Sequence, residues 1–427
     1  MNSKNMIDNI SKGALDSRLV SLYGTDALPM QKSRYISALE KFEELYGTER
    51  EVSIFSVSGR SELSGNHTDH NRGCVIAASI DLDIIAIASK RDDSIIRIKS
   101  EGFPEDVVDI TKYSSQDVSN FGSSASIIAG MAEGIGKRGY IVGGFDAYTT
   151  SNVLKGSGLS SSAAFEDMVG NILNHMYNDG KIDNVEIAKI AQYAENVFFG
   201  KPCGLMDQVA CAAGGIVSID FKNPDAPIVE KLSFDLTDAG YNLCIVNTGG
   251  NHANLTDDYA SIPYEMKSVA AALGGEVLRD TSEKDIITAI ASVREKLGDR
   301  AILRSLHFFE ENKRVARQKD ALKKKDLETF FSEVIASGRS SFCYLQNVYT
   351  NQNPHEQGLS LALCLADIFF ADKRGAFRVH GGGFAGTVQI FVHKDDANEL
   401  KKLMDSVFGD GKTLILKIRA EGAVMVV

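Results

Sequence analysis

The sequence predicts an α+β fold made of two lobes. Strand-like and helix-like segments mix along the chain without the strict strand–helix–strand order of a doubly wound parallel sheet. The chain has 427 residues, more than one hydrophobic core usually organises, so we expect two lobes. We place their boundary near residue 215. This gives an N-terminal lobe at 1–215 and a C-terminal lobe at 216–427, with the final strands able to pack on either.

The pattern of apolar residues predicts the elements in order. Helical spacing predicts a helix at 28–46, and β-branched residues predict strands at 51–57 and 75–89. Small and apolar residues predict a buried helix at 120–137, and a strand at about 143–150 follows it. Further elements are expected as helices at 160–178 and 185–199, a strand at 241–249, a mostly helical stretch at 260–373, and strands near 386–393, 413–419 and 423–427.

Composition excludes several classes of partner and site. The net charge of −11 and the pI near 5.3 argue against nucleic acid or an anionic membrane as the main partner. The six cysteines are scattered and form no CxxC pair, so neither a disulfide framework nor a zinc site is indicated. The first residues have no apolar core like that of a signal peptide, and no apolar run is long enough to cross a bilayer. We therefore expect a cytoplasmic protein.

The first polar motif, GRSELSGNHTDHNRG at 59–73, lies between two strand-like segments. Its polar groups include a guanidinium, an amide, two imidazoles and a carboxylate, those of Arg60, Asn66, His67, His70 and Asp69. These groups predict a hydrogen-bonding site for a hydroxyl-rich molecule, with Arg60 near something anionic. The alternative is an ordinary solvated surface turn.

The second motif, LKGSGLSSSAAFE at 154–166, leads from glycines into serines and then into a predicted helix. Glycines let backbone amides converge, and the amides and dipole of a new helix favour a phosphate. No Lys-Ser or Lys-Thr follows a GxxxxG, so this is no Walker A loop, and it does not match GxGxxG either. The alternative is a serine-rich helix cap.

The third motif, GKPCGLMDQVACAAGG at 200–215, carries one carboxylate, Asp207, among small and apolar residues. A carboxylate there is costly to bury unless it is paired, and Arg60 is the candidate partner; otherwise Asp207 caps a helix. Twelve residues earlier, Glu195 could hold Mg²⁺ together with a serine hydroxyl from 160–162, unless it is a surface glutamate.

The fourth motif, RVHGGGFAGTVQIF at 378–391, has four glycines in the six positions 381–386. They indicate either a close backbone approach to a ligand or another loop, or a tight turn at the start of a strand. The residues alone leave both possibilities open.

Taken together, the four motifs resemble those of the galactokinases, a branch of the GHMP small-molecule kinase superfamily. The first is similar to the signature GRVNLIGEHTDYNxG, the second to PxGxGLSSSAA, the third to GxxCGxMDQ and the fourth to GGGFGG. All four occur in the family's order, and the similarity spans most of the chain from about residue 40. Four ordered motifs are highly specific, although no single one would be.

The resemblance implies a two-lobed GHMP kinase fold with the active site between the lobes. It also implies phosphorylation of the anomeric hydroxyl of galactose or a close relative, with ATP and Mg²⁺, in a monomer or a dimer. The residues it assigns are Asp207 and Arg60 for catalysis, Ser162 and Glu195 for the metal, Asn66, His67, Asp69, Gly204 and Tyr259 for the sugar, and Gly156, Ser157, Gly158, Leu159, Ser160 and Ser161 for the nucleotide.

The departures from the family pattern bear on the substrate. Asn66 replaces a glutamate that accepts a hydrogen bond near the sugar's 6-hydroxyl, and Glu62 replaces an asparagine. Ser64, Leu154 and Ala385 replace an apolar residue, a proline and a glycine. A neutral amide no longer repels a carboxylate at C6, so galacturonate is an alternative substrate.

A non-catalytic sensor of sugar and ATP is a second alternative, because some relatives act as regulators. The small residues Ala163 and Ala164 and the pair Arg60 and Asp207 are all retained, which favours an enzyme. A GHMP kinase for mevalonate or homoserine fits less well, since the HTDHN cluster suits a polyol.

Overall fold

The computed structural model describes residues 1–112, 121–153, 158–201, 203–250 and 255–427. Its strands form two sheets. The eight-stranded sheet contains β1 (Ser53–Ser64), β2 (Cys74–Lys90), β3 (Ile95–Ser100), β4 (Glu105–Asp109), β5 (Phe145–Ser151), β6 (Ile216–Asp220), β7 (Ile228–Leu232) and β12 (Ala423–Met425). The four-stranded sheet contains β8 (Tyr241–Asn247), β9 (Gly375–His380), β10 (Thr387–His393) and β11 (Thr413–Leu416), in the order β11-β8-β10-β9.

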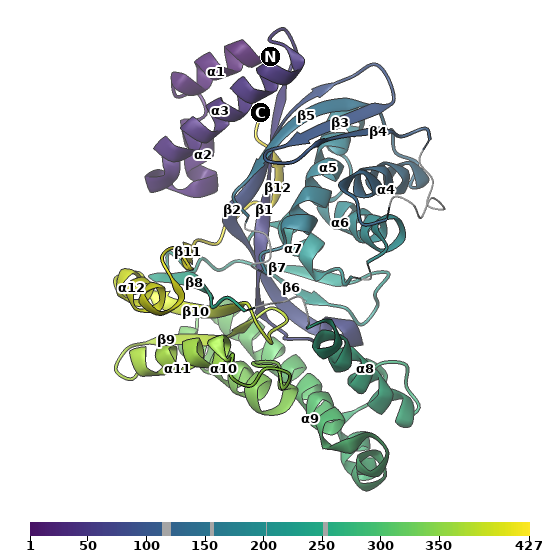
Figure 1. Cartoon of the computed structure of the whole chain (residues 1–427), viewed down its shortest axis with the longest axis vertical. Coiled ribbons are helices and arrows are strands. Elements are labelled where there is room, and N and C mark those ends of the chain that lie inside the picture. The colour runs from purple at the N-terminus through teal and green to yellow at the C-terminus, as the bar shows by residue number, and fades with distance from the viewer. Residues whose placement is uncertain (113–120, 154–157, 202, 251–254) are drawn as a thin grey trace.

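Helices surround both sheets (Figure 1). Those around the larger sheet are α1 (Ser3–Ser11), α2 (Asp16–Tyr23), α3 (Leu28–Tyr46), α4 (Ser124–Lys137), α5 (Ser161–Asn178), α6 (Asn184–Tyr193) and α7 (Met206–Ala213). The others are α8 (Thr256–Ala272), α9 (Glu283–Lys324), α10 (Leu327–Ser340), α11 (Gly358–Phe369) and α12 (Ala397–Phe408). Helix α9 is interrupted at Gly298, where φ is 80°. In the described part of the chain, no helix is both long and apolar enough to cross a membrane.

Helices bury both faces of the larger sheet. Helices α1 to α3 pack on one face against Ile54, Ile85 and Ile87, whereas α4 to α7 pack on the other against Phe55 and Ala86 (Figure 1). Side chains alternate between the faces of a strand, so a strand buried on both sides has a nearly continuous apolar sequence. This is the physical reason for the long apolar run that predicts β2.

Most of the predicted elements are confirmed. The helix predicted at 28–46 is α3, the strand at 75–89 is β2, and the helix at 160–178 is α5. The helix predicted at 185–199 is α6 followed by a π-helical turn, Ala194–Phe199. Sequence analysis did not predict α1, α2, β3, β4, α7, β9 and α12, most of which are short.

One prediction about the first motif is wrong in part. The polar motif at 59–73 is not entirely a loop, because β1 continues to Ser64 and places Arg60 within the strand. Only its second half, from Gly65, turns back toward β2. Strand geometry therefore fixes the direction of the Arg60 side chain.

The two sheets meet where the first and fourth motifs lie. Leu63 of β1 and Ile76 of β2 share a hydrophobic cluster with Leu243 of β8 and Phe391 of β10. Strands β6, β7 and β12 follow residue 215 and still belong to the larger sheet. The strands on both sides of residue 215 therefore belong to the same sheet. The division into lobes at that residue stays a prediction.

Candidate active site

The described structure pairs Arg60 with Asp207, which lie 147 residues apart in sequence. Both Nε and Nη2 of Arg60 donate to Oδ1 of Asp207, at 2.8 and 2.7 Å. The hydroxyl of Ser160 donates to Oδ2 at 2.5 Å. The third nitrogen of the guanidinium, Nη1, donates to the carbonyl of Gly158. Three segments of the chain therefore converge on one carboxylate.

These contacts keep Asp207 ionised. Burial alone would raise the pKa of this carboxyl, but the Arg60 charge and the hydrogen bonds from Ser160 and Arg60 outweigh it, and the pKa is lowered. Asp207 also lies in the first turn of α7, where the helix dipole favours a negative charge. Its side chain is still 35% exposed, so a ligand can reach it.

The segment before α5 brings the serines to the carboxylate through an unusual backbone. Gly158 has φ of 70° and Ser160 has φ of 58°, both in the left-handed region. Leu159 is buried, and its carbonyl accepts from the backbone N–H of Arg60 at 3.1 Å. Gly59 allows this approach, because a Cβ there would lie 2.9 Å from the Leu159 oxygen.

Of the predicted nucleotide residues, the structure thus describes Gly158, Leu159, Ser160 and Ser161. Gly156 and Ser157 lie outside the described residues. Ser161 begins α5 and lines the larger of the two cavities near this site. Leu159 is fully buried, so its contribution comes from its backbone.

Two cavities lie next to each other here. The smaller, of about 250 Å³, is lined by polar groups that include Arg60, Glu62, His67, Asp69, Gly204 and Asp207. The larger, of about 670 Å³, lies between strands β3 to β5 and helices α4 and α5 and has the apolar walls Phe103, Ile127 and Phe165. Ser162, Glu195 and Lys201 line both cavities.

Next to Glu195 of the shared wall lie a second carboxyl group, Glu166 of the larger cavity, and an amide, Gln208 of the smaller cavity. Nζ of Lys201 donates to Oε1 of Glu195 at 2.9 Å. Nε2 of Gln208 donates to Oε2 of Glu195 at 3.0 Å and to Glu166 at 3.1 Å, whereas its Oε1 is buried and accepts no hydrogen bond from any described residue. Burial and the nearby Glu195 charge raise the pKa of Glu166 to about 8. Oxygen atoms therefore dominate this wall.

The first motif holds the glycine loop of the fourth motif. Nδ2 of Asn66 donates to the carbonyl of Gly381 at 2.7 Å, and Nε2 of His67 contacts that of Gly382 at 2.8 Å. The hydroxyl of Tyr259 donates to the carbonyl of Gly383 at 2.8 Å. These contacts confirm the close backbone approach that four glycines in six positions indicate.

Comparison with known proteins agrees with this geometry. Residues 126–215 match the GHMP kinases N terminal domain, and residues 40–90 match the galactokinase galactose-binding signature. A galactokinase of Streptomyces coelicolor is 30% identical over 374 residues, which are 86% of this chain and 92% of that protein. A galactokinase of Glaesserella parasuis is 31% identical over 369 residues, 85% of this chain and 91% of that protein. The chain belongs to the galactokinase family.

Solved structures show the same fold. The structure of Lactococcus lactis galactokinase complexed with galactose has a TM-score of 0.75 and 24% identity, over 91% of this chain and 99% of that one. Methanococcus jannaschii mevalonate kinase has a TM-score of 0.61 and 17% identity, over 86% of this chain and 98% of that one. The predicted α+β GHMP kinase fold is confirmed.

Not all of the residues predicted to bind the sugar line the smaller cavity. His67, Asp69 and Gly204 line it. Gly204 is needed there, because a Cβ would lie 2.6 Å from Oδ2 of Asp69. Asn66 is fully buried and, like Tyr259, is absent from the lining, so both support the glycine loop instead. Their assignment to the sugar stays a prediction.

Several lining residues, among them Glu62 and Lys201, were not among the predicted site residues. A signal for Glu62 was present in the sequence, because it departs from the family pattern two positions after Arg60; the structure places both residues in strand β1. Alternate residues of a strand share a face, so Glu62 follows Arg60 into the cavity. Lys201 had no such signal, since it precedes α7 in an irregular segment.

Proposed function

We propose that this protein is an ATP-dependent kinase that phosphorylates the anomeric hydroxyl of galactose or a close relative. The observation that carries the proposal is the ionised Asp207, held by Arg60 and Ser160 in the smaller cavity. That cavity shares one wall with a larger one whose size and apolar walls fit a nucleotide. The sugar binds in the smaller cavity and ATP in the larger, so that the transferring phosphoryl group lies at the shared wall.

Asp207 accepts the proton of the attacking hydroxyl, or orients that hydroxyl, while Arg60 keeps the carboxylate ionised. General-base assistance of this kind contributes about 10²–10⁴ in rate. Phosphoryl transfer otherwise depends mainly on positioning and on neutralising charge. Lys201 supplies a cation at the shared wall. The amides at the start of α5, next to Ser161 and Ser162, offer donors to phosphate oxygens.

Mg²⁺ fits the shared wall, with Ser162 and Glu195 as its protein ligands. Mg²⁺ prefers oxygen atoms and in kinases is bound by one or two protein groups together with phosphates. The wall and the adjacent Gln208 offer such atoms, since Oε1 of Gln208 accepts no hydrogen bond from the residues that the structure describes, and Lys201 already holds a positive charge against Glu195. Among the described residues, no three His, Cys, Asp or Glu side chains are grouped to hold a metal ion alone. When bound, Mg²⁺ supplies neutralisation of charge on the phosphate oxygens.

The charges of the smaller cavity favour a neutral sugar. Four carboxylates line it, those of Glu62, Asp69, Glu195 and Asp207, whereas the Arg60 and Lys201 charges are already paired with Asp207 and Glu195. A carboxylate at C6 would add another negative charge to this space, and like charges at short range repel strongly. We therefore favour galactose over galacturonate as the substrate.

A panel of sugars tests this function. Purified protein with MgATP is offered galactose, galacturonate, N-acetylgalactosamine, glucose and arabinose, and the release of ADP is measured. We expect turnover with galactose and little with galacturonate. Absence of sugar-dependent ADP release from every sugar contradicts the proposal. Binding of both ATP and galactose without turnover would instead favour the sensor.

A further inference from the structure

We propose that Glu62 is the specificity-determining residue of the sugar cavity, where one of its carboxylate oxygens accepts a hydrogen bond from a hydroxyl of the sugar. In this proposal Asn66 is a positioning residue that does not touch the sugar. The inference rests on the proposed sugar-kinase function and deepens it, because it names the group that distinguishes one sugar from another.

The strand geometry directs Glu62 into the cavity. Arg60, Ser61 and Glu62 pair in regular register with Ser79, Ala78 and Ala77 of β2. Alternate side chains of a strand point the same way, and residues two apart are about 6.6 Å from each other along it. Arg60 and Glu62 both line the cavity, one strand repeat apart. A sugar whose reacting hydroxyl lies at Asp207 therefore extends toward Glu62.

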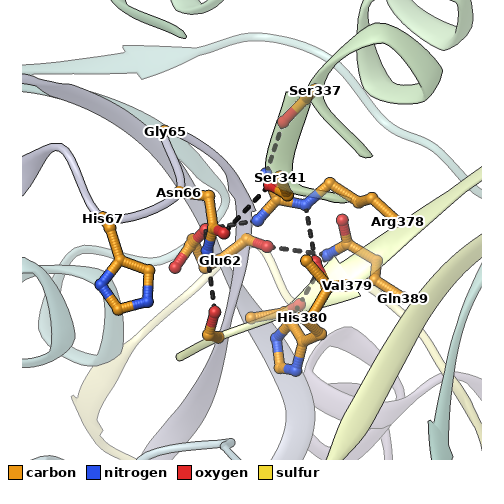
Figure 2. A network of polar contacts seen from close by, with 12 residues as sticks. Glu62, Gly65, Asn66, His67, Ser337, Ser341, Arg378, Val379, His380 and Gln389 are labelled. Carbon is orange, nitrogen blue, oxygen red and sulfur yellow. Dashed lines mark hydrogen bonds and ion pairs between the residues drawn. The ribbon is translucent and has the colours of Figure 1, made fainter. Parts of the chain in front are cut away.

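One oxygen of the Glu62 carboxylate is held by the protein and the other is available. Oε1 accepts from Nη2 of Arg378 and from Nδ2 of Asn66, the latter at 3.3 Å. Oε2 accepts no hydrogen bond from any residue that the structure describes, although only 5% of Glu62 is exposed. Figure 2 shows Glu62 between His67 on one side and Arg378 on the other. An enclosed carboxylate oxygen without a donor is a site for a ligand hydroxyl.

Arg378 fixes the position of the Glu62 carboxyl group. This guanidinium is fully buried in β9, donates to the carbonyl of Val379 at 3.0 Å and to the hydroxyl of Ser337 at 3.1 Å, and pairs with Glu62 (Figure 2). A second carboxylate, Glu311, lies 3.7 Å from Nη1 of the same guanidinium. One cation is thus shared between two carboxylates, and burial raises the pKa of Glu62 despite the charge of Arg378. An oxygen of the carboxyl group keeps acceptor capacity on its open side.

Asn66 has no free hydrogen-bonding position for the sugar. Its Nδ2 donates to Gly381 and to Glu62, and its Oδ1 accepts from Ser341 at 3.1 Å and from Asn347 at 2.9 Å. An amide offers two donors and two acceptor positions, and here each is used. Asn66 therefore acts through Glu62 and the glycine loop, which it joins (Figure 2).

The test compares Glu62→Gln with the wild type on galactose and on its 2-, 3-, 4- and 6-deoxy analogues. A hydrogen bond to a charged group contributes about 10- to 100-fold. We expect the wild type to discriminate by this factor in kcat/KM against one deoxy sugar. Glu62→Gln should lose a similar factor with galactose, lose the discrimination, and keep the KM for ATP. A folded Glu62→Gln enzyme with the wild-type pattern of preferences overturns the proposal.

Glu311→Gln is the matched control, since it removes the other carboxylate near Arg378 but does not line the cavity. We expect it to lower thermal stability and to keep the wild-type preference among the deoxy sugars. If Glu62→Gln fails to fold because Arg378 loses its counter-charge, the double variant Glu62→Gln/Arg378→Gln is measured instead. It removes both charges and keeps side chains of similar shape, and the same results on the deoxy sugars support or overturn the proposal.

The two hypotheses fail differently. If the wild type turns over galactose but treats all deoxy sugars alike, the role of Glu62 is refuted while the kinase function stands. If the wild type turns over no sugar at all, the proposed function itself fails.

Discussion

Replacing Asp207 by asparagine tests the central pair most directly, because the structure allows the change with little rearrangement. The asparagine oxygen can accept from both nitrogens of Arg60, as Oδ1 of Asp207 does at 2.8 and 2.7 Å. The new NH₂ group then faces Ser160, whose hydroxyl can turn from donor to acceptor. What disappears is the negative charge and the ability to accept a proton.

We expect kcat to fall by about 10²–10⁴, which corresponds to about 3–5 kcal/mol in the barrier. The affinities for galactose and ATP should change only a few-fold, because the contacts that hold Asp207 in place are kept. Stability should fall by no more than about 3 kcal/mol, the upper range for hydrogen bonds to a charged group.

The assay measures steady-state ADP release together with binding of each substrate and thermal unfolding. Ser160→Ala is the control, since it removes one hydrogen bond to Asp207 but no charge, and we expect it to cost about tenfold or less. An Asp207→Asn enzyme that folds, binds both substrates and keeps kcat within tenfold of the wild type would refute the role of Asp207. If Ser160→Ala lowers kcat as much as Asp207→Asn does, the loss of activity comes from disturbed packing around Asp207 and not from the loss of its charge.

Three further changes have distinct expected results. Glu195→Gln should raise the Mg²⁺ concentration for half-maximal activity about tenfold or more, measured by metal titration at saturating ATP. Gly383→Ala should lower the free energy of unfolding by about 3 kcal/mol or more, since φ is 81° and the new Cβ would lie 2.0 Å from the Asn347 oxygen. Gly381→Ala, with φ of 67° and nothing within 4 Å, is its mild control in the same unfolding assay. Burial lowers the pKa of His67 from 6.5 to about 4, so folding favours the neutral ring and stability should fall as pH drops from 6.5 to 4, by up to about 3 kcal/mol from this group. Denaturation curves at several pH values should show a weaker fall for His67→Gln, and an unchanged pH profile would contradict the assignment.

The sequence predicts the catalytic pair because burial cost is a local argument. A lone carboxylate such as Asp207 among small apolar residues needs a cation, and Arg60 is a fixed cation of the first motif. The long strand β2 and helix α3 were predictable for a similar reason, since their apolar patterns are long and regular. Helices α1 and α2 have only nine and eight residues, too few to establish a helical period against a mixed polar background.

The exchange of Asn66 and Glu62 could not be interpreted from the sequence, because both side chains are placed by residues far away in the chain. The partners of Asn66 are Ser341, Asn347 and Gly381, between 275 and 315 residues further on. The fixed charge beside Glu62 is Arg378 on β9, 316 residues away. Which of the two faces the sugar depends on these contacts and not on the motif.

The same contacts explain why the two residue types belong at these two positions. At position 66 the nearest group is the carbonyl of Gly381, 2.7 Å away, which needs a donor and would repel a carboxylate. At position 62 the nearest charged group is the buried guanidinium of Arg378, which needs an anion. Asparagine at 66 and glutamate at 62 satisfy both demands, whereas the reverse order would leave a carboxylate against a carbonyl and an arginine against an amide. The carboxyl group of the motif therefore remains at the smaller cavity, but strand β1 carries it instead of the loop that follows.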